Sequence, residues 1–362
     1  MPDKSKASVN TQRASWARLT LQALRPALRM LSRPSNLVQF PRLVTEGVAP
    51  VRRLLIQAHN QREITRLIQS GSRINFISSF ARSGNTWTRN LLADALLQAN
   101  GIKTDTDLPV PYQEVVPDFY CESVVRRSTS IQSKGILVKT HDTYDQLCER
   151  FCAPSGSEAE IENLCDSAFR NSRIVYLFRS PEDVLVSYFH LQRKVKYIAH
   201  SPFGIDEFCR SNLPHWMDNM SSYLKAESRG VSIFFASYEG MLREPASVLS
   251  EILRWLEIPH DAGIVERAVA HMQFANLRAR EERASPGTTE YALRRGRAGA
   301  GLEELQPQTR CEIREESAPL LKRAHKLVAR QSSAPRTVLP LFKPGKAAPA
   351  EAAARSKLLQ PV

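Results

Sequence analysis

The stretch INFISSFARSGNTW, residues 74–87, decides the fold. Residues 74–80 are rich in apolar side chains, and a short apolar run of this kind is typical of a strand buried on both faces of a parallel sheet. A turn with one cation, one glycine and several hydroxyl or amide side chains follows. Beyond Trp87, apolar residues recur at helical spacing up to Asn100–Gly101, a helix-ending signal. The stretch therefore predicts a strand, a tight loop and a helix.

Three further apolar runs predict strands of the same kind: Ile136–Thr140, Ile174–Phe178 and Ser232–Ser237. Residues 180–183 (SPED) are typical of a helix start, with Ser at the N-cap, Pro at the first helical position and acids in the first turn. Strands that alternate with helices favour a single doubly wound α/β domain with a central, mainly parallel sheet. Ligands of such sheets bind at the carboxyl ends of the strands, so the functional residues are expected there.

The loop after the first strand has the features of an anion site. Backbone N–H groups and the helix dipole converge there on a negative group. Arg82 adds a fixed positive charge, Gly84 permits close approach of the backbone, and Thr86 offers a hydroxyl. A P-loop nucleotide kinase or triphosphatase is the alternative, but its GxxxxGK[ST] pattern is absent because Asn85 follows Gly84. The strand 174–178 also ends in Arg179 and not in a magnesium-binding Asp, which favours a metal-free anion site.

With two more blocks, the chain resembles the sulfotransferases that use 3′-phosphoadenosine-5′-phosphosulfate (PAPS), of the cytosolic type and with a bacterial-like character. Residues 81–87 (ARSGNTW) resemble the loop of that family that binds the 5′-phosphosulfate, usually PKSGTTW. Residues 176–190 (YLFRSPEDVLVSYFH) resemble its 3′-phosphate segment, and residues 138–141 (VKTH) resemble its strand-end KTH. Residues 294–299 (RRGRAG) resemble its closing loop, RKGxxG. The matches keep the family's order over roughly residues 73–325.

The resemblance implies a set of residues that bind PAPS, with PAP (3′-phosphoadenosine-5′-phosphate) as the product and no metal. Trp87 would stack on the adenine, with Tyr238 at its edge and Phe274 packed on the same ring. Arg179 and Ser187 would hold the 3′-phosphate, over which the basic loop would close. The full set is Arg82, Ser83, Gly84, Asn85, Thr86, Trp87, Arg179, Ser187, Tyr238, Phe274, Arg294, Arg295 and Gly296.

The resemblance also implies the catalytic residues. His141 would be the base that removes the acceptor proton, a role suited to an imidazole whose ordinary pKa lies near neutrality. Because PAP leaves as an anion, Lys139 and Arg82 would stabilise the charge on the bridging oxygen. The reaction expected is transfer of a sulfuryl group from PAPS to a hydroxyl or amine. Carbohydrate, lipid and small-molecule acceptors all stay open, and residues 105–130 and 195–225 are expected to form the acceptor wall.

Three positions depart from the family pattern. Arg82 replaces Lys, which keeps the charge but presents it as a planar fork. Met272 stands where a hydroxyl residue often contacts adenine. Ala300-Gly301-Leu302 replaces the usual acid-Trp-Lys after Gly299, so the closing loop is expected to grip the donor less firmly.

Composition limits the partners. The 362 residues carry a formal charge of +13, which indicates anionic ligands. A nucleic-acid partner is not expected, since neither basic residues interleaved with aromatics nor a known module is present. The chain has no apolar run of the roughly 18 residues that a membrane-spanning helix needs. Six cysteines without a CxxC pair indicate a reducing compartment, and with no visible signal peptide a cytoplasmic location is expected.

The charge is concentrated near the N-terminus, where residues 1–60 hold ten Lys or Arg and two acids. Arg18, Arg25, Arg29 and Arg33 recur there at helical spacing opposite apolar residues, although Pro26 would kink such a helix. This arm is interpreted either as a peripheral membrane or partner contact or as a solvated extension, with a transit peptide as a third alternative. Residues 61–330 are expected to form the sulfotransferase domain, and residues 331–362 a disordered tail.

Overall fold

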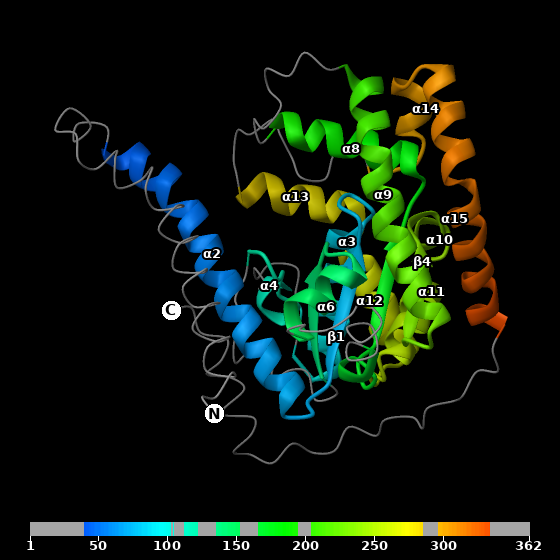
Figure 1. Ribbon diagram of the computed structural model, residues 1–362. Coiled ribbons are helices and arrows are strands. Elements are labelled where there is room, and N and C mark those ends of the chain that lie inside the picture. The colour runs from blue at the N-terminus through cyan, green and yellow to red at the C-terminus, as the bar shows by residue number, and fades with distance from the viewer. Residues whose placement is uncertain are drawn as a thin grey trace, which may run out of the picture. The chain divides into compact units, whose positions relative to one another are not determined.

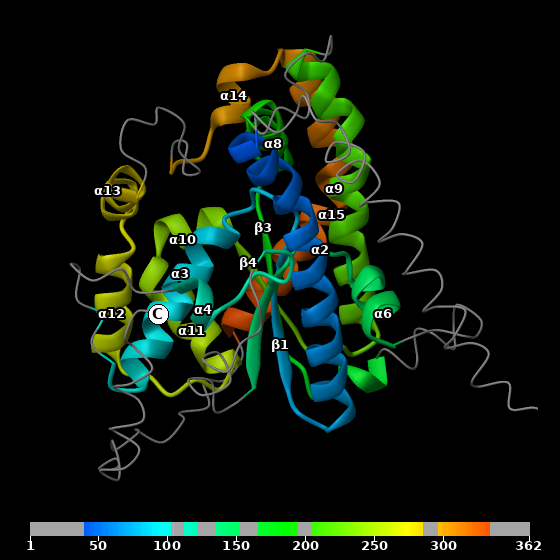
Figure 2. The ribbon, with the colours of Figure 1, turned by 90° about the vertical axis from the view of Figure 1, so that its left-hand side faces the viewer.

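The computed structural model describes residues 40–102, 104, 112–121, 135–152, 166–194, 204–284 and 296–333. Within these ranges the centre is a four-stranded sheet in the order β2-β1-β3-β4, shown in Figures 1 and 2. The strands are β1 (Ile74–Ser79), β2 (Ile136–Thr140), β3 (Ile174–Phe178) and β4 (Ile233–Ser237). Every neighbouring pair is parallel. The four predicted strands are therefore confirmed, each within one residue at either end.

The helices account for most of the remaining described residues. They are α2 (Phe40–Gln69), α3 (Asn85–Ala99), α4 (Tyr112–Val115), α6 (Tyr144–Cys152), α8 (Pro181–Lys194), α9 (Ile205–Ser228), α10 (Tyr238–Arg243), α11 (Pro245–Trp255), α12 (Ala262–His271), α13 (Phe274–Ala284), α14 (Ala300–Glu304) and α15 (Pro307–Ser333). The helix expected after the first loop is α3, which ends at Ala99 with Asn100 as its C-cap. Helix α8 begins at Pro181, as the residues 180–183 predict.

The sheet is buried on both faces, because every residue of the four strands is buried. Successive strand residues point to opposite faces. Phe76 and Tyr176 thus join a core with α6, α8, α9 and α15, whereas Ile77 and Val175 join a second core with α3, α11 and α12. Figure 2 shows these two helical layers on opposite sides of the strands. The predicted doubly wound α/β architecture is confirmed.

The parallel register brings the ends of the strands to one edge. Ser78 of β1 pairs with Thr140 of β2 and with Tyr176 of β3, and Phe178 pairs with Ser237 of β4. The residues that directly follow each strand therefore gather at the same edge of the sheet, where a ligand site is expected.

Two helices extend across the predicted domain limits. Helix α2 runs across the limit expected at residues 60 and 61, while the compact units divide between Asn60 and Gln61. Helix α15 continues to Ser333, past the expected start of the tail. The basic arm, residues 18–33, and residues 334–362 lie outside the described residues. No described helix is both long and apolar enough to span a membrane.

Candidate active site

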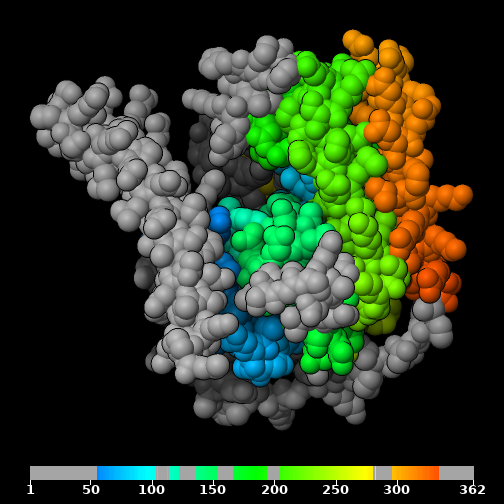
Figure 3. Space-filling model, in the orientation of Figure 1, coloured from blue at the N-terminus to red at the C-terminus, as the bar shows by residue number. Residues whose placement is uncertain are grey.

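A cavity of about 310 Å³ lies at the carboxyl ends of the strands. It is formed by the loop after β1, the end of β2, the residue after β3, the first residue of α10, one side of α8 and the start of α14. Figure 3 shows the hollow beneath the green surface of α8 and α9. Its lining consists of Ala81, Arg82, Gly84, Asn85, Thr86, Trp87, Lys139, His141, Arg179, Ser187, Leu191, Tyr238, Gly296, Arg297 and Ala300.

The loop after β1 is held by its own polar groups. Asn85, which is buried at the start of α3, donates from Nδ2 to Ser79 Oγ at 3.0 Å. Arg82 has a φ of 74°, uncommon for a residue with a side chain, and its Nε donates to Ser187 Oγ of α8 at 3.0 Å. Ser83, by contrast, is buried outside the cavity lining, and its N–H donates to Phe80 O at 3.3 Å within the loop.

Gly84 is required by the close approach of a side chain. Its φ is 99°, and it forms the N-cap of α3. A Cβ at this position would lie 2.5 Å from Cδ2 of Tyr238. Tyr238 in turn packs its ring against Arg179, whose guanidinium carbon is 4.3 Å from the ring centroid, within cation–π range. The absence of a side chain at Gly84 thus lets the ring of Tyr238 lie directly against the loop after β1.

Arg179 follows β3 directly and is buried. Its Nη2 donates to Asp183 Oδ2 at 3.1 Å and to the main-chain oxygen of Arg297 at 3.0 Å. Its Nε is also buried and has no hydrogen-bond partner among the described residues. A buried guanidinium with one N–H group unused is well suited to bind an anion.

The same Asp183 carboxylate holds the start of α14 against α8. Its Oδ2 accepts from the N–H of Gly299 and its Oδ1 from that of Gly301, both at 2.8 Å. A Cβ at Gly301 would lie 2.4 Å from Cβ of Glu182, so glycine allows this contact. Where the sequence departs from the family pattern, at residues 300–302, the start of α14 is thus held to α8 by these two main-chain hydrogen bonds. The sequence marks Asp183 as part of a helix start and of the block 176–190, whereas this contact with the start of α14 appears only in the fold.

Two of the three expected adenine residues lie together. Trp87 and Tyr238 meet edge to face, with ring centroids 6.1 Å apart, and Trp87 Nε1 donates to the main-chain oxygen of Met272 at 2.9 Å. The Met272 side chain is buried in the core, so its departure from the family pattern affects the interior. Phe274 is 38% exposed and does not line the cavity. It packs instead on Gly296, where a Cβ would lie 2.2 Å from Phe274 Cδ2.

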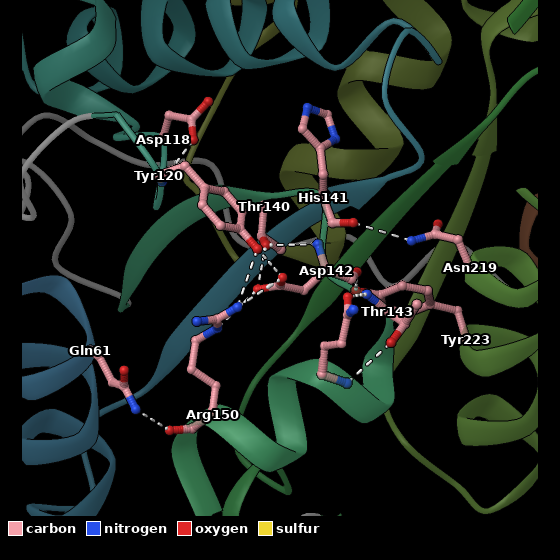
Figure 4. A network of polar contacts seen from close by, with 11 residues as sticks. Gln61, Asp118, Tyr120, Thr140, His141, Asp142, Thr143, Arg150, Asn219 and Tyr223 are labelled. Atoms are coloured by element: carbon pink, nitrogen blue, oxygen red, sulfur yellow. Dashed lines mark hydrogen bonds and ion pairs between the residues drawn. The ribbon is translucent and has the colours of Figure 1, made fainter. Parts of the chain in front are cut away.

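His141 follows β2 and lines the cavity. Its Nδ1 donates to the main-chain oxygen of Ser79 at 2.9 Å, and its own carbonyl accepts from Asn219 Nδ2 at 3.2 Å. In Figure 4 the imidazole points away from the cluster of Asp142 and Arg150 that secures the backbone behind it. The ring is thus oriented from its Nδ1 side.

The charge state of His141 follows from its surroundings. Burial lowers the pKa of the imidazole, and the ammonium of Lys139 and the guanidinium of Arg82 lower it further, whereas the Ser79 carbonyl and the Asp118 carboxylate oppose these effects. The result is a pKa of about 4. His141 is therefore neutral at pH 7 and can accept a proton.

Lys139 does not stand alone in the cavity. Its Nζ donates to Asp118 Oδ2, and both side chains are almost fully buried. Burial raises the pKa of the Asp118 carboxyl, but the charge and hydrogen bond of Lys139, together with the Tyr120 N–H and the charge of His141, hold the pKa below its usual range. Sequence reasoning missed Asp118, since the acid comes from a segment with no recognisable motif and meets Lys139 only through the fold.

Comparison with known proteins identifies the family. Residues 74–317 match the protein family described as the sulfotransferase domain. The chain belongs to the sulfotransferase family. This assignment decides against the kinase or triphosphatase alternative, in agreement with the missing P-loop lysine.

Two plant proteins illustrate how similar the chain is to individual relatives. Flavonol 3-sulfotransferase of Flaveria bidentis is 26% identical over 221 residues, which cover 57% of this chain and 65% of that protein. Cytosolic sulfotransferase 7 of Arabidopsis thaliana is 25% identical over 64% of this chain and 74% of its own length. The chain thus spans just under two thirds of the first of these relatives. A mouse sulfotransferase crystallised with PAP aligns with a TM-score of 0.46 and 15% identity, covering 76% of this chain and 96% of that one.

In the sulfotransferase domain, most of the residues expected to bind donor or to catalyse line one cavity. Ser83 and Phe274 are described and do not line it, and Arg294 and Arg295 lie outside the described residues. Within the described part of the chain, no group of three or more His, Cys, Asp or Glu side chains is placed to hold a metal ion.

Proposed function

We propose that this protein transfers a sulfuryl group from PAPS to a hydroxyl or amine of an acceptor and releases PAP. One observation carries the proposal: a neutral histidine, His141, shares one cavity with the cations Arg82, Lys139 and Arg179. These cations follow or end three different strands, so they form a fixed positive wall at the sheet edge. Such a wall suits a donor with several negative charges, and the histidine suits an acceptor that must lose a proton.

The residues present fit the donor. Residues 82–87 and the N-terminus of α3 would receive the 5′-phosphosulfate. Arg179, whose buried Nε has no partner among the described residues, would bind the 3′-phosphate together with Ser187 and residues 294–296. Trp87 and Tyr238 would meet the adenine ring. Ser83 and Phe274 would support the donor site from outside the cavity lining, Ser83 within the loop after β1 and Phe274 by its packing on Gly296.

The proposed reaction is a single in-line displacement. The acceptor proton moves to Nε2 of His141 while the acceptor oxygen or nitrogen forms a bond to sulfur. The bond between sulfur and the bridging oxygen breaks, and its electron pair stays on PAP. Arg82 and Lys139 stabilise the charge that develops on that oxygen. Because these groups are already in place before the reaction, little reorganisation is needed.

The acceptor is proposed to be a hydroxylated molecule, whether carbohydrate, lipid or small molecule. Leu191 of α8 adds an apolar side chain to the cavity lining, and the described parts of the expected acceptor wall are residues 112–121 and 204–225. A panel of candidate acceptors assayed with radiolabelled PAPS would identify the class.

The location and the partners of the N-terminal part are also proposals. We propose a cytoplasmic protein whose basic arm makes a peripheral membrane contact, and the concentration of charge in residues 1–60 supports that contact.

Binding of PAP measured by calorimetry in EDTA tests the proposed function. PAP and PAPS should bind without metal. They should bind far more tightly than ATP or adenosine 5′-phosphosulfate, since neither of these carries a 3′-phosphate. An absence of PAP binding, or equal affinity for all four nucleotides, would overturn the proposal.

A further inference from the structure

Asp118 and Lys139 form an ion pair that is built into the edge of the sheet. Both side chains are nearly buried, at 8% and 9% exposed, and Lys139 Nζ donates to Asp118 Oδ2. The main chain aligns them: Lys139 N donates to Pro117 O, and Phe119 N donates to Lys139 O, each at 2.9 Å. The second carboxylate oxygen, Oδ1, accepts from Tyr120 N at 2.9 Å. The carboxylate is therefore fixed in place independently of the lysine.

The pair stands beside the histidine that the reaction requires. Lys139 and His141 both line the cavity, two residues apart at the end of β2. Among the described residues, the groups that act on the imidazole include two cations, Lys139 and Arg82, the carboxylate of Asp118 and the carbonyl of Ser79. A proton taken up by the ring would make a third cation there. Asp118 is the carboxylate that balances it.

Resting on the proposed function, we propose that Asp118 is a positioning residue of the transfer reaction: its carboxylate holds the Lys139 ammonium beside His141 and offsets its charge while the donor is bound. When the acceptor attacks sulfur, the proton moves to His141 and the electron pair of the broken bond stays on PAP. Lys139, already paired, contributes little to donor affinity in the ground state. Its interaction strengthens only as charge grows on the bridging oxygen, and such interactions raise turnover more than affinity.

Calorimetry with PAP tests this without an acceptor. In Asp118→Asn, Lys139 loses its anion and turns to the ligand, so PAP should bind about tenfold more tightly, as one added unit charge near a phosphate commonly produces. Lys139→Met alone should change PAP affinity by less than about threefold, because in the parent protein the ammonium is engaged by Asp118. In the double variant the gain should disappear, since the ammonium that would turn to the ligand is absent.

Two further variants separate position from general damage. Asp118→Glu keeps the charge and should bind PAP like the parent protein. Asp166→Asn removes a carboxylate that pairs with Arg229 outside the cavity lining, with its Oδ2 2.9 Å from Arg229 Nε, and should leave PAP affinity unchanged. Thermal melting checks that each variant is folded, and if Asp118→Asn does not fold, Lys139→Met decides alone.

The outcomes distinguish this inference from the proposed function. If the parent protein fails to bind PAP, both are overturned. If it binds PAP but Asp118→Asn binds no more tightly, or if Lys139→Met loses tenfold or more in affinity, only the role of Asp118 is overturned. A gain in Asp118→Asn that disappears in the double variant supports the inference.

Discussion

His141 Nδ1 donates to the main-chain oxygen of Ser79 at 2.9 Å, and this bond decides which ring nitrogen is free for chemistry. A carbonyl can only accept, so the proton of the neutral ring sits on Nδ1 and the lone pair on Nε2. Ser79 ends β1 and His141 follows β2, so the pairing of two neighbouring strands orients the proposed base.

The first prediction concerns loss of that base. His141→Ala should lower turnover by about 10²–10⁴, the usual contribution of a positioned proton acceptor, and leave PAP affinity nearly unchanged. His260 provides a matched control, because its Nδ1 also bonds a main-chain oxygen, Ile258 O at 2.8 Å, outside the cavity lining. His260→Ala should therefore retain full turnover. Turnover near the parent value in His141→Ala, measured at saturating PAPS, would show that the base lies elsewhere.

The second prediction is the pH dependence. The pKa of His141 in the free protein is about 4, lowered by burial and then by Lys139. Protonation removes the base, so kcat/KM for PAPS should fall as the pH drops through about 4 and stay constant above it. Bound PAPS places negative charge near the ring and raises this pKa. The acid limb of kcat/KM for the acceptor, measured at saturating PAPS, should therefore lie at a higher pH than the limb for PAPS.

An acid limb that is the same for both substrates, or that persists unchanged in His141→Ala, would contradict the assignment of the base. The acceptor for these measurements is the one that the panel identifies.

Much of the fold could be predicted from the sequence because its signals are local. Each strand is a short apolar run, and residues 180–183 contain the whole signal for the start of α8. The order β2-β1-β3-β4 is not local, since it depends on how distant segments pack. The parallel sheet then placed residues from separate motifs at one edge, which the general rule for doubly wound sheets anticipates.

The part of the site that sequence could not reveal is the set of partners that the functional residues take. Lys139 meets Asp118, and Arg179 meets the main-chain oxygen of Arg297, through contacts between segments that are far apart in the chain. Such contacts leave no periodic or spacing signal. Phe274 is a further case: its expected adenine contact follows from its position along the chain, whereas its packing on Gly296, a residue of the cavity lining, appears only in the fold.

The third prediction concerns the 3′-phosphate. Arg179→Ala should weaken PAP binding by roughly 1.5–3 kcal/mol, the range for a charge-assisted hydrogen bond. Affinity for adenosine 5′-phosphosulfate, which has no 3′-phosphate, should change much less. Arg179→Lys keeps the charge but not the fork, so it should recover only part of the loss. Equal losses for both nucleotides would assign Arg179 to the fold, through Asp183 and Tyr238, and not to the phosphate.

The fourth prediction concerns the basic arm. A protein lacking residues 1–39 keeps all of α2 and every described cavity residue, so it should bind PAP like the full chain. If the arm contacts membranes, the full chain should pellet with anionic vesicles at low salt and be released as salt screens the charges, whereas the shortened protein should stay in solution. Equal pelleting of the two proteins would favour the solvated extension.

The fifth prediction isolates the contact between Gly84 and Tyr238. Alanine at Gly84 meets two penalties: a φ of 99°, which side chains rarely adopt, and a Cβ 2.5 Å from the Tyr238 ring. Gly230 has a nearly equal φ of 93° and no atom within 4 Å of the added Cβ, so Gly230→Ala carries the backbone strain alone. Both variants should lose about 1 kcal/mol of stability or more from the backbone, measured by denaturant unfolding. Only Gly84→Ala should also displace Tyr238 from Arg179 and weaken PAP binding; equal PAP affinity in the two variants would show that the ring position does not matter for the donor.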